Sequence, residues 1–157
     1  MGRTLFTLAV LGCFAAVWPL GSAYAQDFGD ASSQTLTTRA WKALEEGDVE
    51  ATLAYTTKCR ELYADEAARQ QEDLEDFLPA ERGHDAWALN DVGTCCFIEG
   101  QAHEKADKKA DAVTSYRRLV KEFGFAQCWD QRGWFWQPAA AARDRLEALE
   151  FDAALAE

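Results

Sequence analysis

Four cysteines follow the first 25 residues of this 157-residue chain, and they are the side chains best suited to covalent chemistry. If the chain is exported, an even number of cysteines favours disulfide bonds. Neighbours on a helix point about 100° apart, which excludes a bond between the adjacent pair. We therefore expect Cys59 and Cys128 each to pair with one of Cys95 and Cys96. The alternative is that some of the four are buried free thiols.

The segment 124–137 is a second candidate site because aromatic residues are concentrated there. Six of the fourteen residues from 123 to 136 are aromatic, against 12% in the whole chain. Tryptophan rings stack on sugars or anchor peptides, and an arginine among them can stack on a ring or pair with Asp130. In the alternative interpretation the rings form a lid over the core, and at least one of Trp134 and Trp136 is then buried. The candidate binding residues are Trp129, Arg132, Trp134, Phe135 and Trp136.

Other residue patterns give no support for catalysis. His84 and His103 lie near no nucleophile motif, and there is no Gly-x-Ser-x-Gly sequence and no glycine-rich phosphate loop. His103 and Asp107 have the spacing of two ligands on one helix, but two ligands do not make a metal site. No Cys-x-x-Cys motif is present. We predict no catalytic residue, no cofactor and no metal.

The first 25 residues have the pattern of a cleaved export signal. Arg3 precedes an almost wholly apolar run over 5–20, and the small residues around Ala25 form a cleavage site. The mature chain is expected to begin at Gln26 and to be periplasmic or secreted. A retained membrane anchor is one alternative, and lipidation of Cys13 is another.

The chain is acidic, with a formal net charge of −11 from 16 basic and 27 acidic side chains. Binding to nucleic acid requires lysine and arginine to displace counterions, so this charge argues against a nucleic-acid partner. It also disfavours adsorption to anionic lipid. Contact with a membrane is therefore expected only if Cys13 is lipidated.

Apolar residues at helical spacing dominate the rest of the chain and predict an all-α fold. Residues 26–34 are polar and form a flexible leader, and residues 35–157 have the length of one domain. Gly47 and Asp48 mark the break between the first two helices. A final helix over 138–155 opens with Pro138, as a first helical turn permits.

The clearest helical pattern lies in two expected helices, residues 86–99 and 104–123. Gly93 lies on the apolar face of the first helix and lets the second approach closely. Ala112 and Tyr116 supply a small residue and an aromatic one on the second helix. The expected packing residues are Leu89, Val92, Gly93, Cys96, Ala112 and Tyr116.

This ordering resembles a tetratricopeptide repeat, whose helix pairs follow a Leu-Gly-x-x-Tyr, Ala-x-x-x-Phe pattern. The resemblance covers 36–63 as a first repeat and 86–123 as a second. The segment between Gly100 and Ala112 is two helical turns longer than in the standard repeat, and we expect Ala102, Ala106 and Ala110 to continue the inner helical face. An acidic insertion over 64–85 separates the repeats and is expected to be solvated.

The resemblance implies a right-handed stack of antiparallel helix pairs, covered at its end by the helix over 138–155. It also implies a non-enzymatic scaffold or adaptor whose concave face binds a protein or peptide in the cell envelope. A second hypothesis is a cell-wall or polysaccharide-binding protein that uses Trp129, Trp134 and Trp136. A glycan hydrolase is a third, although no acid/base pair can be named for it.

Overall fold

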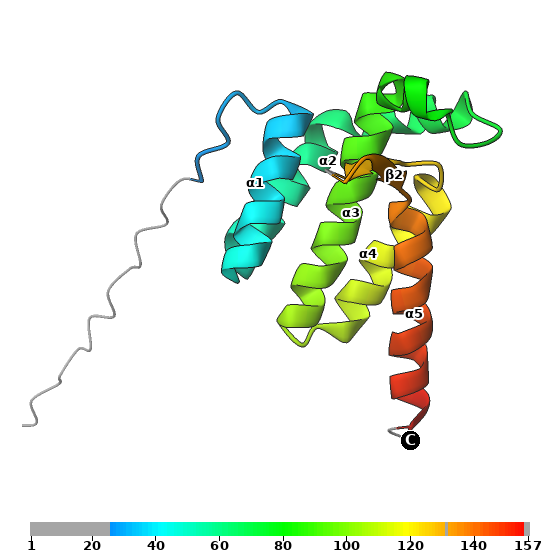
Figure 1. Ribbon diagram of the computed structural model, residues 1–157. Helices are drawn as coiled ribbons and strands as arrows, with labels where there is room; N and C mark the ends of the chain where they lie inside the picture. The colour runs from blue at the N-terminus through cyan, green and yellow to red at the C-terminus, as the bar shows by residue number, and fades with distance from the viewer. Residues whose placement is uncertain (1–25, 131, 156–157) are drawn as a thin grey trace, which may run out of the picture.

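The computed structural model describes residues 26–130 and 132–155, and the chain is mostly helical, as predicted (Figure 1). The expected export signal over 1–25, with Cys13, lies outside the described residues. The elements in chain order are α1 (Ser33–Glu46), α2 (Val49–Glu72), the 3₁₀ helix η1 (Ala80–Ala86), α3 (Trp87–Lys105), α4 (Lys109–Glu122), β1 (Cys128–Asp130), β2 (Trp134–Trp136) and α5 (Pro138–Leu155).

The first two helices have well-defined ends. The Ser32 hydroxyl accepts a hydrogen bond from the Thr35 amide and caps the start of α1. Gly47 ends α1 in the left-handed conformation, with φ of 78°, where a residue without Cβ is favoured. The Asp48 carboxylate then accepts from the Ala51 amide and starts α2. The helix start at Ser33 means that the expected leader over 26–34 is two residues too long.

Helix α3 is the centre of the fold and contacts each of the other four helices. In Figure 1, α1 lies to the left of α3 and α5 lies to its right. Almost every residue from Ala88 to Gly100 is buried, so this helix is apolar around most of its circumference. The core is therefore arranged around α3, and the other elements are positioned by their contacts with it.

Two glycines of α3 allow close packing on its α4 side. A Cβ on Gly93 would collide with the side chain of Ala126, just after α4, and would touch Leu119. A Cβ on Gly100 would collide with the ring of Tyr116. All six expected packing residues are buried, and the closest approach to Gly93 comes from Ala126 rather than from α4 itself.

One expected boundary is wrong. The extra residues before Ala112 lengthen α3 to Lys105 instead of starting the fourth helix near Glu104, and the chain turns at Asp107, whose φ is 57°. In the insertion over 64–85, α2 continues to Glu72 and η1 begins at Ala80, and most of the acidic side chains are exposed, as expected.

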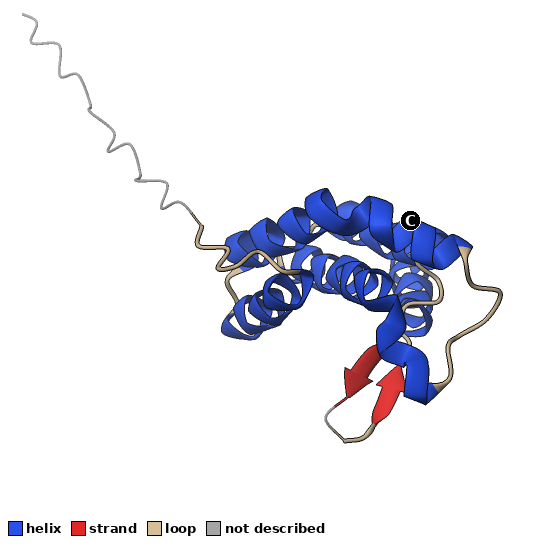
Figure 2. Ribbon diagram, turned by 90° about the horizontal axis from the view of Figure 1, so that it is seen from above, coloured by secondary structure: helices blue, strands red, loops and turns tan. Residues whose placement is uncertain are grey.

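The aromatic segment contains a two-stranded antiparallel hairpin that projects from the helices (Figure 2). Trp129 is paired with Phe135, and the turn is closed by a hydrogen bond from the Gly133 amide to the Asp130 carbonyl. In the described part of the chain, no helix is both long and apolar enough to cross a bilayer.

Candidate functional site

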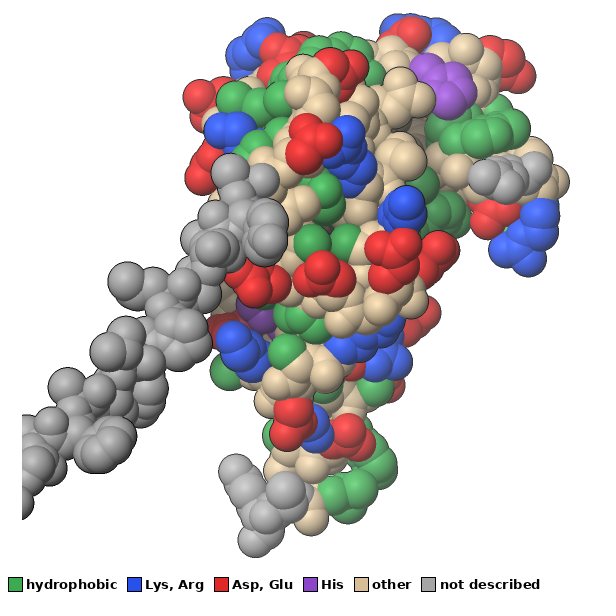
Figure 3. All heavy atoms as spheres, turned by 90° about the vertical axis from the view of Figure 1, so that its left-hand side faces the viewer, with side chains coloured by type: hydrophobic (Ala, Val, Ile, Leu, Met, Phe, Trp, Pro, Cys, Tyr) green, Lys and Arg blue, Asp and Glu red, His purple; other side chains and the backbone are tan. Residues whose placement is uncertain are grey.

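A groove of about 990 Å³ lies between α1, the first half of α3, η1 and the hairpin. We call it the aromatic groove. In Figure 3 the hairpin projects on the right of the face on which α1 lies, and the groove opens between them. Its aromatic lining comes from every wall and consists of Trp41, Tyr63, His84, Trp87, Trp129 and Phe135.

A buried amide fixes the walls of the aromatic groove to its floor. The side chain of Asn90, on α3, donates to the carbonyl of Gly83 at 2.6 Å and accepts from the Gln127 amide at 2.8 Å. The Gln127 side chain donates in turn to the Leu78 carbonyl at 2.9 Å. Asn90 thus connects η1 and the base of the hairpin to α3, so both walls are held at one point.

Asp91 lines the aromatic groove and is the more buried of its two acids. Its carboxylate accepts a hydrogen bond of 2.5 Å from the Ser33 hydroxyl at the start of α1. Burial raises the pKa of Asp91, and the hydrogen bond from Ser33 offsets only part of that shift. No lysine or arginine of the described chain lines this groove, whose other acid is Glu45.

The hairpin directs its aromatic residues to two different faces, because successive strand residues alternate. Trp129 and Phe135 share one face, with ring centroids 5.0 Å apart, and both line the aromatic groove. Phe135 also packs on Gly83, where a Cβ would collide with the ring, and its centroid is 5.1 Å from that of His84.

The opposite hairpin face has one inward ring and one outward ring. Trp136 is partly buried and meets Phe97 of α3 edge-on at 5.2 Å, so it contributes to the core. Trp134 is 45% exposed, and the guanidinium of Arg132 lies 4.5 Å from its ring centroid. Arg132 also pairs with Asp130 at 3.0 Å. The candidate residues from 129 to 136 therefore divide between the groove, the core and an exposed tip.

The four cysteines after residue 25 are free thiols in this structure, so the expected disulfides are absent and their pairing stays a prediction. The positions of the thiols favour the expected pairing of Cys59 with one of the two adjacent cysteines. Burial and the adjacent Cys59 thiol both raise the pKa of Cys95, which places Cys59 of α2 beside Cys95 of α3. Cys128 lies instead beside Thr94 and Trp136, and burial raises the pKa of its thiol.

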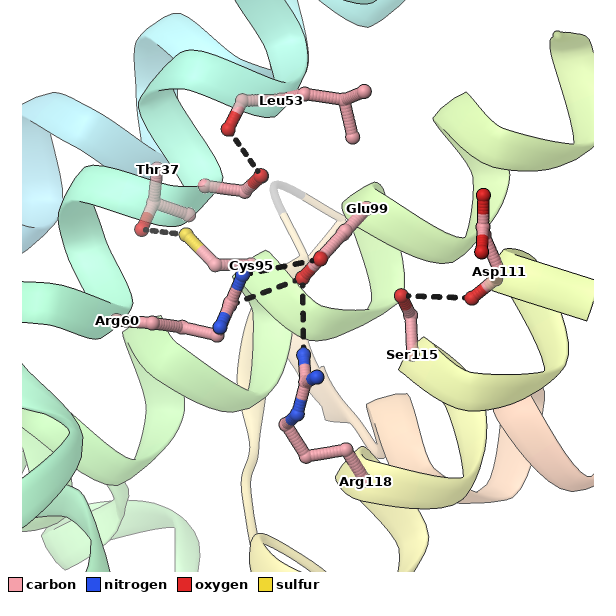
Figure 4. A network of polar contacts seen from close by, with 9 residues as sticks. Thr37, Leu53, Arg60, Cys95, Glu99, Asp111, Ser115 and Arg118 are labelled. Carbon is pink, nitrogen blue, oxygen red and sulfur yellow. Dashed lines mark hydrogen bonds and ion pairs between the residues drawn. The ribbon is translucent and has the colours of Figure 1, made fainter. Parts of the chain in front are cut away.

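A second buried carboxylate on α3 lies on the side away from the aromatic groove. Glu99 is 7% exposed and pairs with Arg60 of α2 at 3.0 Å and with Arg118 of α4 at 3.5 Å (Figure 4). Burial and the nearby Glu99 carboxylate raise the pKa of Cys96 to about 12. This network joins α2, α3 and α4, so its charges are paired within the fold.

Sequence reasoning missed most of the groove. Trp41, Trp87, Asn90 and Asp91 were not candidate site residues, although Trp87 and Asp91 have the four-residue spacing that puts them on one helical face. Two adjacent polar residues in the otherwise apolar start of α3 were the available signal. Their partner Ser33 lies 58 positions earlier, so the sequence alone does not link them.

The two residues with the spacing of metal ligands, His103 and Asp107, do not lie on one helix in the structure. His103 lies on α3, but Asp107 lies in the turn after the helix ends, so the two do not share a helical face. Within residues 26–130 and 132–155, no three histidine, cysteine or acidic side chains gather to hold a metal ion. Comparison of the chain with known protein families, curated proteins and solved structures gave no match.

Proposed function

We propose that this protein is a non-enzymatic interaction scaffold of the cell envelope, similar in organisation to tetratricopeptide-repeat proteins, that binds an extended peptide segment of a partner protein. The observation that carries the proposal is the aromatic groove, with its half-exposed Trp87 and Trp129. Large exposed rings in a concave site are typical of protein-binding hot spots, because each buries much area at a low cost in entropy.

Several features of the groove favour a peptide as its ligand. Its exposed polar groups include Thr38 and Gln34, which can exchange hydrogen bonds with a peptide backbone. The contacts of α3 with both α1 and α5 agree with a layer of first helices, the layer that lines the concave face of a helical-repeat stack. Export of the chain is proposed from the sequence of its first 25 residues alone.

A cell-wall polysaccharide is the second candidate ligand, and the half-exposed Trp129 is the observation in its favour. The hairpin argues against a polysaccharide site built from Trp129, Trp134 and Trp136 together. Trp129 and Trp134 lie on opposite faces of the ribbon, and Trp136 packs on Phe97, so these three indoles form no common stacking platform. A bound sugar would instead have to stack within the groove.

Site-specific photo-crosslinking in the native host tests the proposal. A photoreactive residue replaces Gln34, an exposed residue of the groove wall, and the matched control replaces Glu147, an exposed residue of α5. The proposal expects a discrete protein adduct from position 34 and none from position 147. Equal adducts from both positions, or none from position 34, would contradict it.

Two further measurements complete this test. Retention of the purified protein on insoluble cell-wall glycan, lost when Trp129 is changed to alanine, would favour the second candidate. The N-terminal sequence of protein recovered from the envelope fraction tests export, with Gln26 as the expected first residue. Recovery of the uncleaved chain from the cell interior would contradict the proposed location.

A further inference from the structure

The aromatic groove has a marked asymmetry of charge. Its charged lining residues are two acids, Asp91 and Glu45, and none of the described lysines or arginines lines it. Elsewhere on the face seen in Figure 3, acidic and basic side chains are interspersed. A peptide that enters the groove therefore meets two acidic side chains and no basic side chain of the described residues.

Asp91 is the stronger of these two acids as a ligand-binding group because of where it lies. It is partly buried and lies one helical turn from Trp87, and among residues 26–130 and 132–155 its hydrogen-bond donor is the neutral Ser33 hydroxyl. A carboxylate has several acceptor positions, so its other lone pairs remain available to donors that enter the groove. A partly desolvated carboxylate with no cation beside it is costly to the fold unless a ligand supplies the charge.

The aromatic walls favour the same kind of ligand. Trp87 and Trp129 are 45% and 49% exposed and both line the groove, and Tyr63 meets Trp87 edge-on at 5.6 Å. The face of an indole ring attracts a cation, most strongly a guanidinium, and the attraction grows when water is excluded. A carboxylate at the floor and indole rings at the walls are complementary to a long, positively charged side chain.

We propose that the aromatic groove receives an arginine or lysine side chain of the bound peptide, with Asp91 accepting its N–H groups and Trp87 and Trp129 bordering its aliphatic stem. This inference rests on the proposed function, since it specifies which peptides the groove selects. The partner segment is therefore basic, in agreement with the net charge of −11 on the whole chain.

Selection from a random peptide library tests the inference. Three forms of the full chain are used: wild type, Asp91→Asn, and Asp144→Asn as a matched control on an exposed residue of α5. We expect wild type and Asp144→Asn to enrich peptides that share one arginine or lysine position. Asp91→Asn keeps the side-chain shape but removes the charge, and we expect it to lose this enrichment.

Affinity measurements on one enriched peptide sharpen the test. Replacement of its shared arginine by citrulline, which has the same shape without the charge, is expected to weaken binding about tenfold or more for wild type. The same replacement is expected to change little for Asp91→Asn. Gln34→Lys places an ammonium group beside Ser33 in the groove wall. Its positive charge repels the basic peptide, so binding is expected to weaken although Asp91 is unchanged.

The outcomes separate the two levels of the argument. Enriched peptides that share no basic position, or that Asp91→Asn retains equally, would overturn this inference and leave a peptide-binding groove. If no peptide is enriched by folded wild-type protein, both the inference and the proposed function are overturned. Thermal unfolding of each form shows whether loss of binding reflects loss of the fold.

Discussion

Glu99 and Asp91 are two poorly exposed carboxylates of helix α3 whose surroundings in the fold are opposite. Glu99 is 7% exposed and lies between two arginines from two other helices. Asp91 lies eight residues earlier, about 12 Å along the same helix, with a serine hydroxyl as its hydrogen-bond donor. The first charge is neutralised within the fold, whereas the second faces a groove.

The presence of paired arginines identifies Glu99 as a structural acid, and their absence around Asp91 identifies it as a candidate binding acid. A buried charge that is paired on both sides holds elements together, and removal of one partner leaves the others unpaired. A partly buried charge without a cation raises the free energy of the folded chain, and a cationic ligand relieves that cost. The same chemical group on the same helix thus has two functions, determined by its neighbours.

The largest effect is expected at the paired acid. Glu99→Ala leaves Arg60 and Arg118 without their shared counter-charge and should lower the free energy of unfolding by about 3 kcal/mol or more. Urea denaturation measures this change. Glu122→Ala, an exposed acid of α4, is the control and should change it by less than about 0.5 kcal/mol. Equal effects of the two variants would mean that the network does not join the helices.

The hairpin allows the same comparison between two aromatic residues. Trp136→Ala removes a ring that packs on Phe97 and should lower the free energy of unfolding by about 2–4 kcal/mol. Trp134→Ala removes an exposed ring that contacts Arg132 and should change it by about 0.5 kcal/mol. Thermal unfolding of the two variants side by side measures the difference. A greater loss for Trp134 would contradict the assignment of the inward ring.

A smaller effect of opposite sign is expected at the unpaired acid. Asp91→Asn removes a charge that burial disfavours, so the free energy of unfolding should stay the same or rise within about 1 kcal/mol. The hydrogen bond from Ser33 can be kept by the new amide oxygen. Calorimetry detects this change as an unchanged or higher melting temperature. A clear fall in the melting temperature would show that Asp91 is needed by the fold rather than by a ligand.

The last prediction concerns pH. Because the pKa of Asp91 is raised on folding, its full cost to stability is present above that raised pKa. The cost declines as the pH falls below the raised pKa and is lost below the pKa of the unfolded chain. The stability advantage of Asp91→Asn over wild type should therefore shrink as the pH falls through the raised pKa. Four other titratable groups line the groove and are common to both proteins, so their own titration cancels to first order; they are Glu45, Tyr63, His84 and Cys128.

Paired unfolding curves at several pH values measure this difference. Ligand binding gives an independent check, because protonated Asp91 no longer attracts a cation. Affinity for the basic peptide should therefore fall together with the stability difference. An advantage of Asp91→Asn that stays constant with pH would mean that ionisation of Asp91 is not its source.

The sequence predicts the helices well wherever apolar periodicity is long. The stripe through Leu89, Val92 and Cys96 predicts α3, and the Gly47-Asp48 break separates α1 from α2. The end of α3 was placed wrongly because small alanines on both sides of Asp107 fit either a continuous helix or a turn. The turn places Asp107 at positive φ, which aspartate adopts more often than most residues other than glycine.

The hairpin and the groove were missed for different reasons. Strands of three residues are too short to show alternation, although Asp130 and Gly133 carry a turn signal. Asp91 could not be identified as a site residue from the sequence, because its neighbours come from distant segments. These neighbours are Ser33 of α1 and Trp129 across the groove. Periodicity records which face of a helix is buried, but it does not record what the partly buried polar positions meet.

The hydrogen bonds of Asn90 have a consequence for the order in which the chain acquires its structure. The groove combines α1, near the start of the described chain, with the hairpin near its end. Asn90 of α3 connects the base of the hairpin to η1, and Asp91 beside it is bonded to Ser33 of α1. Such long-range contacts form late in folding, because the intervening chain must first be ordered. A nascent or partly folded chain therefore has no complete groove, and the ability to bind a ligand there reports that folding is finished.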